Sequence, residues 1–124
     1  MWDALFWIYL VTLIFMTNHE IDSAYQKEWE LIGLPGGINL FLLLHFPLLF
    51  VFLWGLVLVY QERSAGLVLS LILSLFGMAS LVIHSLFIKK GHRGFTSPMS
   101  QFILWSTALV SAVGAVVAIS IMLK

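Results

Sequence analysis

The sequence contains no cysteine. This absence excludes disulfide bridges, cysteine-ligated zinc, iron–sulfur clusters and thiol nucleophiles. Charged residues are also scarce, at 10% of the chain, and acidic and basic residues balance to a formal net charge of zero. Because the chain has no basic stripe, nucleic acid is not expected as a partner.

Hydrophobic residues make up 61% of the 124 residues, more than a soluble domain of this size can hide from water. Four continuous apolar stretches are each close to the roughly 20 residues that cross a hydrocarbon core about 30 Å thick. They run over residues 2–18, 38–60, 65–88 and 101–123. We therefore expect an all-α, integral membrane four-helix up-down bundle that forms a single membrane domain over residues 1–124.

The expected helix ends carry recognisable signals. Residues 33–37, with three glycines and a proline, break the chain before the second span, and residues 61–64 form a tight connection after it. Ser97 followed by Pro98 is typical of an N-cap with proline at the first helical position. Pro47 lies inside the second span and is expected to kink it.

Two expected helices each carry a face of small residues. In the third span, Gly66, Ser70, Ser74, Gly77 and His84 fall on one side, which predicts that His84 faces the bundle interior. In the fourth span the small residues are Thr107, Ala108, Ser111, Gly114, Ala115 and Ala118. A neighbouring helix can approach such a face closely, so homo-oligomer formation through the fourth helix is one expectation.

Lysine and arginine indicate the orientation. Lys27, Lys89, Lys90 and Arg93 lie in the connections after the first and third spans, whereas the opposite side has Arg63 and Lys124. The positive-inside rule then places both termini outside and these two connections in the cytoplasm. We expect a bacterial inner membrane protein.

Up-down threading predicts that all four histidines and most of the acids gather at one membrane face. These residues are His19, His45, His84 and His92, with Glu20, Asp22, Glu28 and Glu30. If the first helix continues past Asn18, then His19, Asp22 and Glu30 share an inward stripe. Glu20 then lies on the flank, and Glu28 points away.

Imidazoles and carboxylates on several inward-facing helices are typical ligands of zinc, manganese or iron when thiolates are absent. The predicted metal ligands are His19, Asp22, His45 and His84. A metal there can activate water to attack an ester, amide or phosphodiester of a lipid or amphiphilic substrate, with Glu20 or Glu30 moving the proton.

An anionic head group of such a substrate would be held by cations at the same face. The candidates are Lys89, Lys90 and Arg93.

Simpler interpretations stand beside these. A histidine near a membrane interface often only hydrogen-bonds to a backbone carbonyl or a serine, which applies to His45 and His84. His92 and Glu28 are simply explained as solvated. The aromatic residues near the span ends, Trp2, Trp29, Tyr60 and Trp105, are typical interfacial anchors or lipid-facing bulk.

Two other functions stay open. One is a haem-binding electron-transfer anchor with His45 and His84 as axial ligands, which predicts a coloured protein. The other is a non-catalytic membrane subunit or small transporter. Small multidrug transporters place a glutamate in the middle of their first helix, and this first span has none, which favours an accessory role over a proton-coupled carrier.

The chain resembles small uncharacterised bacterial four-helix membrane proteins with a His-Glu pair at the end of the first helix and a Glu-Trp motif after it. It is also distantly similar to HXXEE-domain proteins. The matching positions are His19, Glu20, Asp22, Glu28, Trp29, Glu30, His45 and His84. Asp22 and Ser23 stand where the HXXEE pattern has its two glutamates, so the resemblance implies membrane architecture more than a shared activity.

Overall fold

The computed structural model describes all 124 residues as an all-helical chain. The elements are α1 (Trp2–Tyr25), α2 (Glu28–Leu31), α3 (Gly37–Tyr60), α4 (Ser64–Lys89) and α5 (Pro98–Met122). All except the single-turn α2 are long and apolar enough to cross a membrane. The expected all-α membrane bundle is confirmed, and α3, α4 and α5 begin and end within three residues of the predicted limits.

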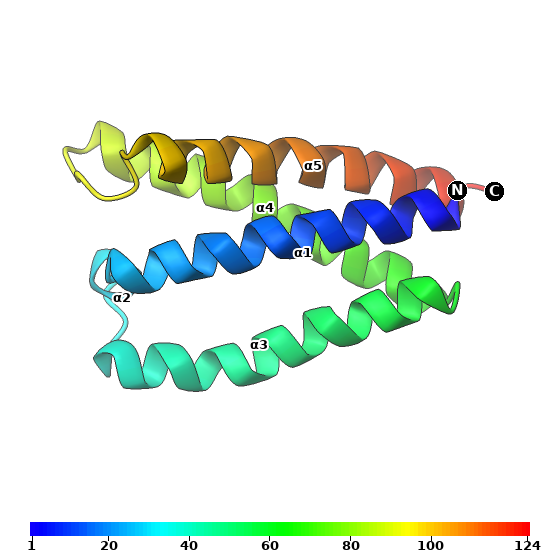
Figure 1. The fold of residues 1–124 in the computed structure, drawn as a ribbon, viewed down its shortest axis with the longest axis horizontal. Coiled ribbons are helices and arrows are strands. Elements are labelled where there is room, and N and C mark those ends of the chain that lie inside the picture. The colour runs from blue at the N-terminus through cyan, green and yellow to red at the C-terminus, as the bar shows by residue number, and fades with distance from the viewer.

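The long helices run up and down beside one another (Figure 1). Both chain termini lie at one end of the bundle, and α2 and the α4–α5 connection lie at the other. α1 contacts α5 and α3, and α4 contacts the same two helices. This arrangement brings the end of α1, the start of α3 and the end of α4 to the same face.

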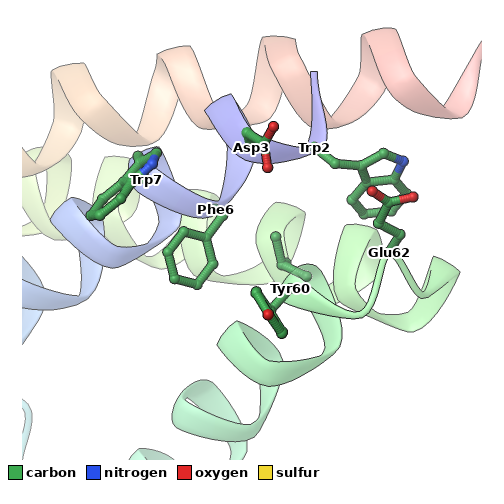
Figure 2. A pocket seen from close by; sticks show the side chains of 7 residues that line it. Trp2, Asp3, Phe6, Trp7, Tyr60 and Glu62 are labelled. Atoms are coloured by element: carbon green, nitrogen blue, oxygen red, sulfur yellow. The ribbon is translucent and has the colours of Figure 1, made fainter.

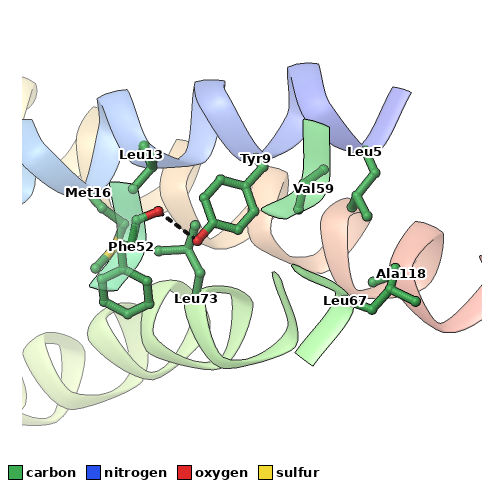
Figure 3. Close-up of a cluster of buried hydrophobic side chains, with 9 residues drawn as sticks. All are labelled: Leu5, Tyr9, Leu13, Met16, Phe52, Val59, Leu67, Leu73 and Ala118. Atoms are coloured by element: carbon green, nitrogen blue, oxygen red, sulfur yellow. Dashed lines mark hydrogen bonds between the residues drawn. The ribbon is translucent and has the colours of Figure 1, made fainter. Parts of the chain in front are cut away.

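The core lies in the middle of the bundle and towards the chain termini (Figure 3). Its nine buried side chains are Leu5, Tyr9, Leu13, Met16, Phe52, Val59, Leu67, Leu73 and Ala118. The Tyr9 hydroxyl donates a hydrogen bond to the Phe52 carbonyl oxygen at 2.9 Å, which ties α1 to α3. Gly55 makes this possible because a Cβ there would collide with the Tyr9 hydroxyl.

The small-residue face of α5 packs inside the chain. Gly77 of α4 faces Ser111 and Thr107 so closely that a Cβ would collide with the Ser111 hydroxyl. Farther along, the place of a Cβ at Gly114 is 3.2 Å from an Ile8 methyl group. α4 and α1 therefore cover much of this face within the chain, and homo-oligomer formation through α5 stays a prediction.

The helices differ in how much of them the bundle buries. Only 17% of the most apolar part of α3 is buried, against 39% for α4, so α3 presents most of its surface to lipid. α3 runs through Pro47 without ending there.

Two helix ends near the histidines are well defined: the end of α1 and the start of α5. α1 continues two turns beyond Asn18, to Tyr25. A helix of its 24 residues is about 36 Å long, so its last turns extend past a hydrocarbon core of about 30 Å. At the start of α5, the Ser97 hydroxyl accepts a hydrogen bond from the Ser100 backbone N–H at 3.1 Å, which confirms the predicted N-cap.

Candidate metal centre

Two histidines meet at the face formed by the end of α1 and the end of α4. The ring centroids of His19 and His84 are 4.9 Å apart, and the two planes are almost perpendicular. Their exposed fractions are 3% and 2%. The gathering of these imidazoles, which the sequence predicted from threading alone, is therefore confirmed.

Glu28 joins them because α1 does not continue into the next segment. α1 ends at Tyr25, and Lys27 takes a left-handed conformation with φ of 53°, after which α2 begins. This turn places Oε1 of Glu28 3.1 Å from Nε2 of His84. The expectation that Glu28 points away was wrong, since it assumed an uninterrupted helix through Lys27.

His19, Glu28 and His84 each offer one ligand atom, and these three atoms all lie within 4.8 Å of one another. In His84, Nδ1 lies 2.6 Å from the Ser80 carbonyl oxygen, which can only accept a hydrogen bond. Nδ1 therefore carries a proton, and Nε2, when it is unprotonated, presents its lone pair to the group. A histidine held in this way through its other nitrogen is typical of metal ligands.

Unsatisfied polar atoms concentrate at this face. Five buried side-chain nitrogen or oxygen atoms have no hydrogen-bond partner: His19 Nδ1, Asp22 Oδ2, Ser23 Oγ, His84 Nε2 and Ser111 Oγ. All but Ser111 belong to the end of α1 and to its neighbour on α4. His84 Nε2 is among them because its close approach to Glu28 lies outside hydrogen-bond directions. A buried polar atom without a partner costs about 1–3 kcal/mol, so this face is where a further polar ligand would be stabilised.

The charge state of Glu28 agrees with this setting. Burial by itself raises the pKa of the Glu28 carboxyl, but the adjacent His84 and Ser23 side chains and the charges of His84 and His19 lower it. The net result is a pKa below the ordinary value. Glu28 is therefore a carboxylate near neutral pH, as a metal ligand must be.

Phe95, from the α4–α5 connection, covers the two imidazoles. Its ring centroid lies 4.1 Å from that of His84 and 5.8 Å from that of His19, and it is 1% exposed. Its carbonyl oxygen accepts a hydrogen bond from Nε2 of Gln101 at 2.7 Å. Sequence reasoning did not single out Phe95, because one phenylalanine in a loop carries no motif or period.

His45 belongs to a separate pair. Its Nδ1 lies 2.6 Å from the Phe41 carbonyl oxygen, and its Nε2 lies 2.7 Å from Oε2 of Glu20. Both ring nitrogens face acceptors, so the pair holds a proton beyond that of a neutral imidazole and a carboxylate. The simpler interpretation of His45 and His84 as carbonyl-bonded histidines is correct for Nδ1 in both. Neither His45 nor Asp22 is part of the three-residue group.

One family model matches nearly the whole chain, including the residues of the candidate site. The DUF6713 family, described as a family of unknown function, matches residues 5–121. The chain belongs to DUF6713. No curated protein and no solved structure matches it. The expected membership of an uncharacterised family is confirmed, while similarity to HXXEE-domain proteins and a bacterial source stay predictions.

The other residues of this DUF6713 chain that the sequence placed at the site are open to solvent. They are Glu30, Lys89, Lys90, His92 and Arg93. For His92 this confirms the predicted solvated state. Glu30 lies on α2 and not on the α1 stripe that the sequence suggested.

Proposed function

We propose that this chain is an integral membrane metalloprotein that binds a divalent ion through His19, Glu28 and His84 at one membrane face. The observation that carries the proposal is that three donor atoms lie within 4.8 Å of one another, two of them on almost fully buried imidazoles. Imidazole and carboxylate are the usual ligands in a chain without cysteine.

A divalent ion resolves the contact between His84 and Glu28. With a neutral ring, the Nε2 lone pair faces a carboxylate oxygen 3.1 Å away, which is repulsive. With a proton on Nε2 the same two side chains form an ion pair, so the metal and this proton compete for the position. Ligand atoms about 2.1 Å from a tetrahedral ion are about 3.4 Å apart, which is close to the 3.1 Å between Oε1 of Glu28 and Nε2 of His84.

The donor set indicates which metals fit. Two imidazoles and one carboxylate are found in catalytic zinc sites, which keep a fourth position open, and in non-haem iron(II) sites. Manganese also accepts these ligands. We favour zinc, because three protein ligands in a partly enclosed site are enough for its four-coordinate geometry.

We propose hydrolysis of an ester, amide or phosphodiester in a lipid or amphiphile as the reaction. A bound divalent ion lowers the pKa of its water towards 7. With an ion held by His19, Glu28 and His84, the water oxygen would bond to the carbonyl carbon or phosphorus, and its proton would pass to the Glu20 carboxylate through the oxygen that His45 does not engage. That proton then goes to the leaving oxygen or nitrogen as its bond to the substrate breaks. Glu20 is the candidate for this role because it directly follows His19, and the contact of its Oε2 with His45 fixes the carboxylate in place.

Basic residues at the same face support an anionic substrate. Lys89, Lys90 and Arg93 are exposed beside the covered site and suit a phosphate-bearing head group. With these cations on the cytoplasmic side, as the positive-inside rule indicates, the substrate would enter from the inner leaflet.

Elemental analysis of detergent-purified protein tests the metal. We expect one equivalent of metal per chain in the wild type, and about a tenth or less in His19→Ala, Glu28→Gln and His84→Ala after the same dialysis. His92→Ala, at an exposed histidine of the same face, is the matched control and keeps its metal. Equal metal content in all of these proteins would overturn the proposal.

The same samples separate the alternative functions. A metal-loaded wild type that releases no fatty acid, amine or phosphate from a total lipid extract would favour a non-catalytic subunit. A Soret absorption band lost in both His45→Ala and His84→Ala would favour haem. The structure gives no support for haem, because Nε2 of His45 faces Glu20 and that of His84 faces Glu28.

A further inference from the structure

The end of the molecule opposite the metal centre has a cavity between the start of α1 and the end of α3 (Figure 2). Its volume is about 480 Å³, within the range of small-molecule sites. Seven residues line it: Trp2, Asp3, Phe6, Trp7, Val59, Tyr60 and Glu62. The hydrolytic proposal uses none of them.

The lining combines aromatic rings with carboxylates and includes no lysine or arginine. Phe6 packs edge-to-face on Tyr60 with centroids 5.9 Å apart, so the rings join the α1 and α3 sides of the cavity. Glu62 lies beside Trp2 at one side, and Asp3 lies above Phe6 on α1 (Figure 2). Aromatic faces attract cations, and organic ammonium groups are the ligands that such cages bind best.

The two carboxylates are exposed to solvent and have no cationic partner within the chain. Neither Asp3 nor Glu62 has a cationic nitrogen within 4.0 Å, although Arg63 directly follows Glu62. Lys124, at the same end, directs its ammonium group to the Met1 sulfur. The dipole of α1 explains an acid at Asp3, in the first turn, but it does not explain Glu62 in the α3–α4 turn.

A second hollow adjoins the first. Trp2 and Glu62 also line a groove of about 650 Å³ between α4 and α5. Its other lining residues are Ser64, Ala65, Leu67, Val68, Ile121 and Met122, most of them apolar. An amphiphile with a cationic head in the cavity would therefore find an apolar surface for its chain next to it.

We propose that this cavity binds an organic ammonium group. Asp3 and Glu62 supply the opposite charge, and the rings of Trp2, Phe6 and Tyr60 supply the cation–π surface. Interfacial anchoring accounts for aromatic residues that face lipid, whereas here two exposed acids line the same hollow as the rings. A lipid head group and a free quaternary amine share this chemistry, and the adjoining groove favours the lipid.

The first arm of the test uses choline and the full chain in nanodiscs of phosphatidylglycerol, which lacks an ammonium group. Tryptophan fluorescence is followed during titration with choline and with its neutral isostere 3,3-dimethylbutan-1-ol. We expect saturable binding of choline alone, weakened about 5-fold in Asp3→Asn and in Glu62→Gln and more in the double variant. Glu30→Gln, at an exposed acid on the other face, is the matched control and stays unchanged.

The second arm uses native mass spectrometry of protein extracted from mixed phosphatidylethanolamine and phosphatidylglycerol vesicles. Retained phosphatidylethanolamine that is lost in the double variant identifies the lipid head group, and choline binding alone identifies a free amine. Circular dichroism checks that the variants fold. The proposal is overturned if the wild type binds neither probe, or if the folded double variant binds as the wild type does.

Discussion

His45 on α3 and His84 on α4 hold their rings in the same way. In each, Nδ1 lies 2.6 Å from the carbonyl oxygen of the residue four positions earlier. In each, a phenylalanine ring lies with its centroid 4.1 Å away, Phe41 for His45 and Phe95 for His84. Both rings therefore present Nε2 in a fixed direction, and both find a glutamate there.

What differs is the second partner. Glu20 meets His45 at 2.7 Å in hydrogen-bond geometry, and the His45 side chain is 15% exposed. Glu28 meets His84 at 3.1 Å and off that direction, beside the second buried imidazole of His19. Both tethered histidines thus pair with a glutamate, but only His84 has a second buried imidazole beside it, which makes it the proposed metal ligand.

The largest expected difference is in metal affinity after removal of each ring. His84→Ala deletes one of three proposed ligands, so we expect zinc affinity to fall by more than about 100-fold. His45→Ala should leave the zinc affinity within about 2-fold of the wild type. A tenfold change would correspond to about 1.4 kcal/mol, so this difference is small. Competition with a fluorescent zinc chelator measures both. An equal loss of zinc affinity in the two variants would mean that His45 and His84 belong to one metal site.

The two glutamates should differ in how metal stabilises the protein. Zinc at 100 times its dissociation constant should raise the unfolding free energy of the wild type and of Glu20→Gln by about 2.7 kcal/mol. Glu28→Gln should gain almost nothing, because it lacks the anionic ligand. Thermal unfolding in detergent with and without chelator measures this. If the Tm of the wild type were the same with and without chelator, the expectation would be wrong.

The two phenylalanines provide a third contrast. Phe95→Ala uncovers His84 and His19, so we expect metal affinity to fall about tenfold, as for other residues that orient ligands. Phe41→Ala opens the ring of His45 instead and should leave metal affinity unchanged. The chelator competition assay serves here too. If the Phe41 variant lost more metal than the Phe95 variant, the assignment of the cover would be wrong.

The smallest effect is expected at the Glu20–His45 pair. Because both side chains are partly exposed, Glu20→Gln should lower the unfolding free energy by about 1 kcal/mol or less. The loss should be the same with metal and with chelator. Chemical unfolding in detergent measures it, and a loss seen only with metal present would instead make Glu20 a ligand.

The sequence was sufficient for the spans and for the face where the polar residues gather. The apolar runs predict the helices. An up-down topology then predicts that His19 and His84 lie at one face, without any knowledge of their contacts. The Ser97–Pro98 start of α5 was equally readable because an N-cap is a local signal.

The members of the candidate site were less predictable. The position of Glu28 depends on the left-handed conformation of Lys27, and non-glycine residues rarely adopt it. The partner of His45 depends on which helices pack against each other. The helical periodicity of the sequence does not show which helices are neighbours. Phe95 reaches the site from a loop whose backbone at that residue also has positive φ.

Both chain ends lie at the pole of the bundle away from α2 and the α4–α5 connection (Figure 1). A reporter protein fused to either end would therefore sit in the same compartment and leave the histidines untouched. Two such fusions, one at Met1 and one at Lys124, should report the same sidedness, and that result would assign the histidine-bearing pole to the other compartment.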